Sequence, residues 1–265
     1  MSQSILHFAH ANGFPADCYR VLLEPLKSQC QVICLDRFGH HPSFPVDHNW
    51  QSLVDELLHH LQQTCGDQPV IGVGHSLGGV ITYMAAIKAP ERFSRLVLLD
   101  PPLLTGWKDS LGLKAAKRFG FIDQVTPAGI TRGRRSHWPD ATIAEQYFAG
   151  KKLFAGFHPQ ALKDYVAFGT EPHPQGGIRL RFDPKVELAI FRNLADNLRG
   201  SHRKIKVPVT IIRGQSSDLL TVEREKTLRA MGFECLQVPG GHMFPLEHPN
   251  ETCQCLLQLL SRSTE

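Results

Sequence analysis

The stretch VIGVGHSLGGVITYMA, residues 70–85, forces the backbone to change direction within very few residues. An apolar β-type run ends at Gly74, and apolar residues then recur at helical spacing from Leu77 onward. Ser76 lies between them, at a turn sharp enough to hold its central residue in an unfavourable backbone conformation. Gly74 and Gly78 supply the small side chains that let strand and helix approach. The stretch therefore predicts a buried strand, a tight turn and a helix.

The pattern around Ser76 is G-x-S-x-G, the sequence signature of a nucleophile elbow. Alone, the pentapeptide is a weak signal, because it also occurs in ordinary loops whose serine caps a helix. The strand before it and the helix of small residues after it favour the catalytic interpretation. A serine hydroxyl is a poor nucleophile unless a base takes its proton. The rest of the chain should therefore supply a histidine, an acid to orient it and an oxyanion hole.

Composition limits the classes of protein to consider. The chain has 265 residues, of which 42% are hydrophobic, and this suffices for one core with an inserted subdomain. The net charge of +4 is mild, and the basic patches at 132–135 and 202–206 lack interleaved aromatic residues. We expect no nucleic-acid partner, and the oligomeric state stays open.

Other absences in the sequence lead to further expectations. The seven cysteines form no C-x-x-C pair, which is typical of reduced thiols in a cytoplasmic protein. No apolar run approaches ~18 residues, so we expect no membrane span. Cysteines and histidines show no metal-ligand spacing, and the phosphate-loop pattern is absent. We expect neither a metal nor a cofactor.

Strand-like and helix-like segments alternate along most of the chain. Expected strands lie at 5–9, 31–35, 70–73, 95–99, 207–213 and 233–238, and expected helices at 17–26, 47–65, 77–85, 221–231 and 245–261. This alternation predicts an α/β fold with a parallel sheet and helices on both faces. Between 103 and 206 the alternation fails. We expect that segment to be a helical lid inserted into a core formed by 1–102 and 207–265.

Together, the elbow and the strand–helix order resemble the α/β-hydrolase family, over most of the chain outside 103–206. That family usually opens with two further strands, whereas the first strand here begins at residue 5. We therefore expect a mostly parallel sheet of about six strands rather than eight. Segments of the insertion, such as RGRRSHWPD, are faintly similar to the lids of lipase-like and esterase-like members.

The resemblance implies a base and an acid at the sheet edge that carries Ser76. His242 comes after the last expected strand through PGGH, where the family places its base. Asp218, in the loop GQSSDLL, gives the chain order Ser, Asp, His that this fold uses. Asp100 is the competitor, because it ends the strand after the elbow and some members use that position.

We favour Asp218 over Asp100 because of their neighbours in the chain. Pro101 and Pro102 come directly after Asp100 and remove two backbone donors that could hold a carboxylate. The loop around Asp218 instead offers backbone N–H groups and serine hydroxyls. The expected triad is therefore Ser76, Asp218 and His242.

An oxyanion hole needs two backbone N–H groups aimed at one point. One should come from Leu77, directly after the nucleophile. The other should come from the loop HANGFPAD, where the family usually shows His-Gly-Phe-Pro and Asn12 replaces the histidine. By this alignment Phe14 supplies the second N–H group, and Asn12 or His10 lines the pocket.

Aromatic residues of the expected lid are candidates for an apolar acyl pocket. The alternative is that they only pack the lid against the sheet. The candidates are Trp107, Phe119, Trp138 and Phe168.

A serine nucleophile attacks a carbonyl and forms an acyl-enzyme that water then cleaves. We therefore expect a serine hydrolase acting on a small carboxylic ester, thioester or lactone. The alternatives are other chemistry on the same triad, such as carbon–carbon bond hydrolysis, thioester hydrolysis or perhydrolysis without a cofactor. A third possibility is a receptor that binds a small ligand and turns it over slowly.

Overall fold

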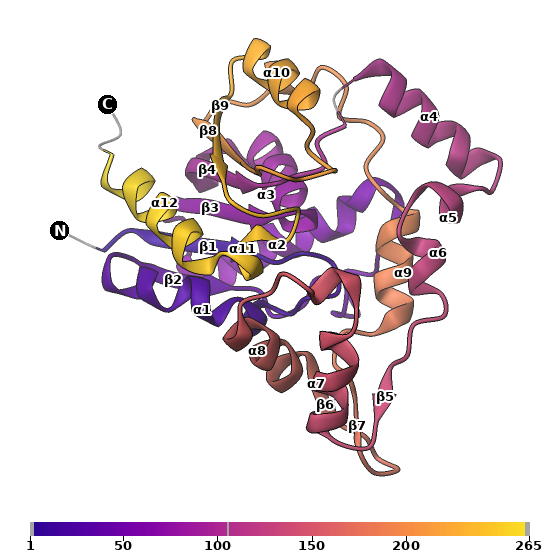
Figure 1. The fold of residues 1–265 in the computed structure, drawn as a ribbon. Coiled ribbons are helices and arrows are strands. Elements are labelled where there is room, and N and C mark those ends of the chain that lie inside the picture. Colours follow the sequence, from indigo (N-terminus) through magenta and orange to yellow (C-terminus); the bar gives the residue numbers. More distant parts are fainter. Residues whose placement is uncertain (1–2, 105, 263–265) are drawn as a thin grey trace.

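A twisted sheet of six parallel strands forms the centre of the molecule (Figure 1). The computed structural model describes residues 3–104 and 106–262. The strand order is β2-β1-β3-β4-β8-β9, which confirms the expected α/β sheet. The strands are β1 (Ile5–Ala9), β2 (Gln31–Cys34), β3 (Val70–His75), β4 (Phe93–Leu99), β8 (Val209–Gly214) and β9 (Glu234–Val238).

Helices connect these strands and cover both faces of the sheet. They are α1 (Arg20–Leu23), α2 (Gln51–Cys65), α3 (Leu77–Lys88), α10 (Val222–Ala230), α11 (Phe244–Glu247) and α12 (Pro249–Ser261). The helix expected over 17–26 is shorter, because 3₁₀ turns at Ala16–Tyr19 and Pro25–Ser28 flank α1. The expected closing helix is divided into α11 and α12 at His248, just before Pro249, since proline cannot donate to the preceding turn.

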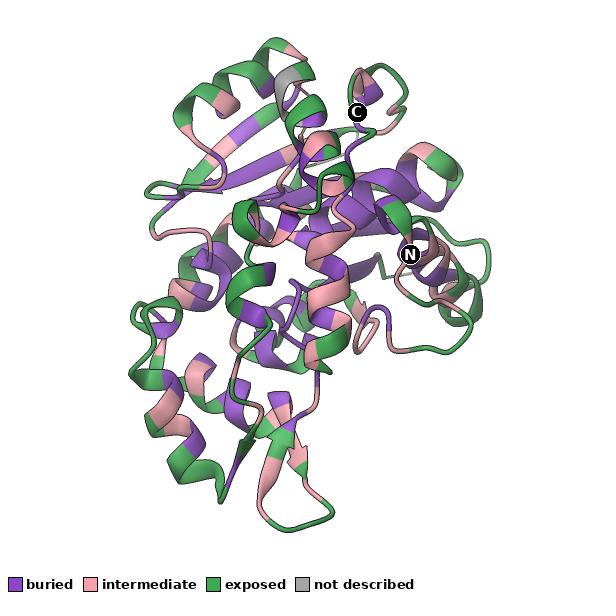
Figure 2. Ribbon diagram, turned by 90° about the vertical axis from the view of Figure 1, so that its right-hand side faces the viewer, coloured by how far each residue is buried: buried purple, intermediate pink, exposed green. Residues whose placement is uncertain are grey.

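Alternate residues of each strand face opposite layers of helices. Ile5 and Ala9 of β1 join the core that includes α2 and α3, whereas Leu6 and Phe8 join the core that includes α1 and α12. This pattern results from the two-residue period of a strand. The central strands are buried on both faces, as Figure 2 shows, and a sheet covered on both faces requires the near-continuous apolar runs seen in the sequence.

The insertion, residues 103–206, leaves the sheet after β4 and returns to it at β8, the neighbouring strand (Figure 1). Its described residues contain six α-helices, two 3₁₀ turns (Lys152–Phe154 and Ser201–Arg203) and a three-stranded antiparallel sheet that the sequence did not predict. Strands of two or three residues carry too little periodicity to be recognised. The division into core and lid stays a prediction. The elements are α4 (Trp107–Arg118), α5 (Ile122–Val125), α6 (Ala128–Thr131), β5 (His137–Trp138), α7 (Ala141–Ala149), α8 (Pro159–Gly169), β6 (Thr170–Pro172), β7 (Ile178–Leu180) and α9 (Pro184–Arg192).

Three further observations concern the described residues. All seven cysteines are unpaired. Across 3–104 and 106–262, no helix is both long enough and apolar enough to cross a lipid bilayer. The same residues contain no cluster of three or more side chains able to hold a metal ion.

A buried histidine in β1 should make the fold sensitive to acid. His7 is fully buried against His60, and neither of its ring nitrogens has a hydrogen-bond partner among the described residues. Burial lowers the pKa of His7 from 6.5 to about 3. The unfolded chain therefore binds a proton that the folded chain does not, and stability falls as pH drops below 6.5.

The parent protein should lose stability between pH 7.5 and pH 5, and we expect this loss to be smaller by about 2 kcal/mol in His7→Leu. The measurement is the free energy of unfolding from urea titrations at both pH values. His59→Leu, at an exposed position of α2, is the control and should lose stability as the parent does. Equal acid losses in the His7 variant and the parent would contradict this expectation.

Candidate active site

The turn around Ser76 has the strained geometry that the sequence predicts. Ser76 lies between β3 and α3 and adopts φ 52° and ψ −115°, a conformation that L-residues rarely take. A Cβ atom at Gly74 would lie 2.4 Å from the carbonyl oxygen of Gly78, and one at Gly78 would lie 2.1 Å from that of Ala9. Neither glycine can be replaced without moving the backbone, so both glycines of the motif are required by the close contact of strand and helix.

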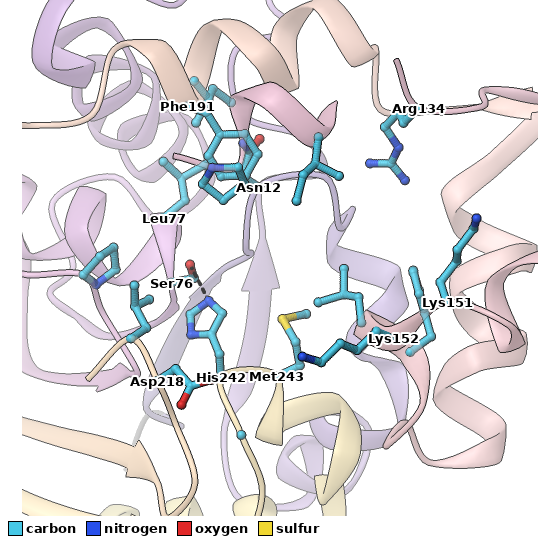
Figure 3. Close-up of a pocket in the computed structure, with 18 of the residues that line it drawn as sticks. Asn12, Ser76, Leu77, Arg134, Lys151, Lys152, Phe191, Asp218, His242 and Met243 are labelled. Atoms are coloured by element: carbon cyan, nitrogen blue, oxygen red, sulfur yellow. Dashed lines mark hydrogen bonds between the residues drawn. The ribbon is translucent and has the colours of Figure 1, made fainter. Parts of the chain in front are cut away.

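A continuous chain of hydrogen bonds links Ser76, His242 and Asp100 (Figure 3 shows the first link). His242 lies in the loop after β9, and its Nε2 is 3.0 Å from the Ser76 hydroxyl oxygen. Its Nδ1 is 2.7 Å from a carboxylate oxygen of Asp100. Because a carboxylate only accepts, Nδ1 carries the proton and Nε2 is free to accept from Ser76. This is the tautomer that a general base requires.

The expected pairing of Asp218 with His242 is wrong. Asp100 occupies that position, whereas Asp218 is exposed and lines the neighbouring cavity. The Asp100 carboxylate is fully buried and accepts hydrogen bonds from the Ser217 hydroxyl at 2.6 Å and the Gly214 N–H at 3.4 Å. These donors come from the end of β8 and the loop after it, so the prolines next to Asp100 do not leave its carboxylate unsupported.

The position of Asp100 in the sheet explains why it reaches His242. It comes directly after β4, and β4 lies between β3, which leads into Ser76, and β8. Its φ of 44° marks a second strained turn at the same edge of the sheet. The carboxyl ends of β3, β4 and β8 therefore meet where the loop after β9 presents His242.

The expected donors of the oxyanion hole are only partly in place. Leu77 is the first residue of α3, so its N–H has no acceptor within the helix. Phe14 is unsuitable, because its N–H donates to the carbonyl oxygen of Ala11 at 3.1 Å. The N–H of Asn12 has no acceptor among the described residues, and Asn12 and Leu77 both line the cavity beside Ser76. Asn12 therefore replaces Phe14 as the candidate for the second donor.

His10 does not line the cavity and instead holds the loop from inside. Its ring is fully buried, donates from Nδ1 to the carbonyl oxygen of Ala11 at 2.8 Å, and accepts from the Phe38 N–H at Nε2, 3.0 Å away. Burial lowers the pKa of His10 to about 4, so the ring is neutral near pH 7. This pattern assigns His10 a structural role.

A second hydrogen-bond chain, which the sequence analysis missed, joins the two loops behind Ser76. The Ala11 N–H donates to the Tyr19 hydroxyl at 3.3 Å, which donates to His75 Nδ1 at 2.7 Å. His75 Nε2 donates to the carbonyl oxygen of His242 at 2.9 Å. Burial holds the pKa of His75 well below its usual range, so its ring stays neutral. The residue before Ser76 thus ties the loop of Asn12 to the loop of His242.

A cavity of about 1030 Å³ opens beside Ser76 and His242 (Figure 3). The core supplies part of its wall and the insertion supplies the rest. Its exposed lining is mostly apolar, which suits the carbon chain of an acyl or alcohol group. Aromatic and thioether side chains in the wall include Trp50, Tyr147, Phe148, Phe154, Phe191 and Met243.

None of the four aromatic residues proposed for the pocket wall is among the described residues that line this cavity. Trp107 and Phe119 are 57% and 73% exposed. Trp138 is fully buried against Tyr147 and Phe148, and the Phe168 ring lies 5.7 Å from the Arg20 guanidinium. Trp138 packs against Tyr147 and Phe148, which themselves line the cavity, so it contributes to packing rather than to the cavity surface.

A sequence model described as the alpha/beta hydrolase family matches residues 8–254. The chain belongs to the alpha/beta hydrolase family. The family match begins within β1 and ends within α12, so it spans the sheet and the insertion alike.

Two curated relatives are similar to parts of this chain. Monoglyceride lipase of Rattus norvegicus is 31% identical over 129 residues, covering 45% of this chain and 43% of the lipase. Type I acyl-CoA thioesterase mpaH' of Penicillium brevicompactum is 28% identical over 234 residues, covering 82% of this chain and 49% of the thioesterase. The chain thus spans less than half the length of these two relatives.

The crystal structure of E-2-(acetamidomethylene)succinate hydrolase has the same fold, with a TM-score of 0.80 at 22% sequence identity. That superposition covers 98% of this chain and 92% of the other.

Proposed function

We propose that the protein is a serine hydrolase that cleaves a small carboxylic ester through an acyl-enzyme. The hydrogen-bond chain from Ser76 through His242 to Asp100, at the wall of a largely apolar cavity, carries this proposal. Thioesters are the second candidate, because one relative that covers most of this chain is named an acyl-CoA thioesterase. We also propose a cytoplasmic location, which the unpaired cysteines support.

Acylation of Ser76 begins with a proton transfer to the neighbouring histidine. His242 Nε2 accepts the hydroxyl proton of Ser76 as the oxygen attacks the substrate carbonyl carbon. The carbonyl oxygen gains negative charge, which the N–H groups of Leu77 and Asn12 stabilise. The carbon–oxygen or carbon–sulfur bond then breaks, and the leaving group takes the proton from His242. The Asp100 carboxylate stabilises the imidazolium that forms.

Deacylation repeats these steps with water in place of Ser76. His242 takes a proton from the water, whose oxygen attacks the acyl carbon. The bond to the Ser76 oxygen then breaks, and that oxygen regains its proton from His242. The products are a carboxylic acid and an alcohol or thiol, so no net change occurs in the enzyme.

Covalent labelling tests this proposal most directly. A fluorophosphonate should add to the purified protein in a one-to-one ratio, and peptide mapping by mass spectrometry should locate the adduct at Ser76. p-Nitrophenyl esters and acyl thioesters of increasing chain length then define the preferred leaving group and acyl group. A Ser76→Ala variant is the control for both measurements. A folded protein that takes up no label and hydrolyses none of these substrates would contradict the proposal.

A further inference from the structure

Three cationic side chains of the insertion line the cavity beside Ser76. They are Arg134, Lys151 and Lys152. Figure 3 shows Arg134 and Lys151 across the cavity from Ser76 and His242, whereas the Lys152 side chain extends toward Met243. We propose that they bind an anionic group of the substrate, a carboxylate or a phosphate, at the end remote from the scissile carbonyl. This inference rests on the proposed ester or thioester hydrolysis and names the class of substrate.

The two lysines carry charge that the protein does not neutralise. Neither Lys151 nor Lys152 forms an ion pair with a carboxylate among the described residues. The Lys151 ammonium lies 4.3 Å from the centre of the Tyr147 ring, which orients it by a cation–π contact and adds no negative charge. Both lysines are exposed at the cavity wall. An anion could therefore bind there while partly hydrated, without the desolvation penalty of a buried ion pair.

Arg134 contributes hydrogen bonds rather than net charge. Its guanidinium is 2.6 Å from the buried carboxylate of Glu187 and donates to the Tyr165 hydroxyl at 3.1 Å. These contacts fix its position and balance its charge. Its other N–H groups have no acceptor among the described residues. Arg134 can therefore orient a planar anion that the lysines attract.

The carboxylates of the cavity lie on the side of the core. Asp218 is beside His242 in Figure 3, and Glu247 of α11 accepts the Gly241 N–H at 2.6 Å. The lining carboxylates therefore belong to the core, with Asp218 nearest His242, whereas the lining cations belong to the insertion, with Arg134 and Lys151 farthest from Ser76. A substrate with a terminal anion gains attraction at the insertion and avoids repulsion near Ser76 by pointing that end away. A substrate with a terminal cation would meet the opposite field.

The apolar wall between the two ends constrains the rest of the ligand. Phe148 and Phe154 line the cavity on the insertion, close in sequence to the lysines. The substrate that fits this arrangement has an ester or thioester at one end, an apolar middle and an anion at the other end. The anion belongs either to the acyl part, as a second carboxylate, or to the leaving group, as a phosphate.

The decisive experiment compares anionic substrates with neutral substrates of matched length in lysine variants. The first pair is the p-nitrophenyl monoester of adipic acid and p-nitrophenyl heptanoate. The second pair is an acyl-coenzyme A and the same acyl group on pantetheine. Lys151→Gln and Lys152→Gln are tested singly and together. Lys163→Gln, at an exposed position of α8 outside the cavity lining, is the matched control.

We expect each substitution to lower the ratio of kcat/KM for the anionic over the neutral substrate by about two- to fivefold. The double variant should lower it by about tenfold, and added salt should reduce the difference between parent and variant. A loss confined to the adipate ester places the anion on the acyl part, and one confined to the coenzyme A thioester places it on the leaving group. Unchanged ratios for both pairs would overturn the inference.

A binding measurement separates this inference from the proposed chemistry. In the Ser76→Ala background, calorimetry measures the Kd of the adipate monoester, of the heptanoate ester and of both the coenzyme A and the pantetheine thioesters. If the Ser76→Ala protein binds the anionic compounds more tightly than the neutral ones, and the double lysine variant reduces this difference in Kd, the anion site is supported. This holds even if the protein hydrolyses none of these compounds. Equal Kd ratios in the two proteins would exclude the site even if hydrolysis is observed.

Discussion

Replacing Ser76 by alanine should lower kcat for ester hydrolysis by about 10⁶-fold, the loss typical of a missing serine nucleophile. The reason is that, among the described residues, only the Ser76 hydroxyl lies within hydrogen-bond distance of His242 Nε2, 3.0 Å away at the cavity wall. The substitution removes one oxygen from a turn held by glycines, so the fold should persist. The measurement is kcat for a p-nitrophenyl ester, with circular dichroism to verify folding.

The fluorophosphonate adduct provides an independent readout for the same variant. The alanine protein should take up no label under conditions in which the parent is labelled completely. Full labelling or unchanged kcat in the variant would place the nucleophile elsewhere.

Asp100→Asn should lower kcat by about 10⁴-fold, because the histidine tautomer is no longer fixed. An asparagine amide can donate to His242 Nδ1, and this would move the ring proton to Nε2, where it blocks acceptance from Ser76. The Ser217 and Gly214 donors that now support the carboxylate would remain in place. The measurement is kcat at saturating ester for the folded variant.

Asp218→Asn is the matched control, since it makes the same chemical change at the cavity wall. Its side chain is exposed and forms no hydrogen bond with His242 in the described structure. We expect a change in kcat of less than about tenfold. A greater loss in the Asp218 variant than in the Asp100 variant would restore Asp218 as the acid.

Features that depend on neighbouring residues could be predicted from the sequence. The elbow at Ser76 is encoded by glycines two residues away, and the contacts at Gly74 and Gly78 result directly from that spacing. The central strands carry apolar runs because both of their faces are buried. Such patterns are local, and a single sequence contains them in full.

The acid could not be identified in the same way, because its support comes from a distant loop. The loop GQSSDLL does supply hydroxyl and N–H donors, as the sequence suggests. The Ser217 hydroxyl, however, donates to Asp100, which lies 117 residues earlier in the chain. The second donor, the Gly214 N–H, is 114 residues from Asp100. Only the adjacency of β4 and β8 brings the two together, and strand order is not encoded locally.

The oxyanion loop shows a second limit of sequence patterns. The motif NGFP can be aligned with the family's HGFP, and this alignment selects Phe14. The turn formed by the Phe14 N–H and the Ala11 carbonyl oxygen instead leaves the Asn12 N–H free among the described residues. Aromatic content likewise failed to identify the cavity wall. Many helices and strands of the insertion are too short for a hydrophobic pattern to show which of their faces is buried.

The adjacency of β4 and β8 has a consequence for how specificity can evolve. Leu99 and Ile212 are register partners, so the chain departs from the sheet and rejoins it at neighbouring points. The hydrogen bond from Ser217 to Asp100 clamps these two points together. One continuous segment of the gene thus encodes most of one side of the cavity, and its two ends lie on neighbouring strands. We expect changes in the length of this segment to leave the order of the sheet unchanged. A transplanted segment must preserve its contacts with the core, such as the bond from the Asn12 side-chain amide to the carbonyl oxygen of Glu187 and the ion pair between Arg20 and Asp164.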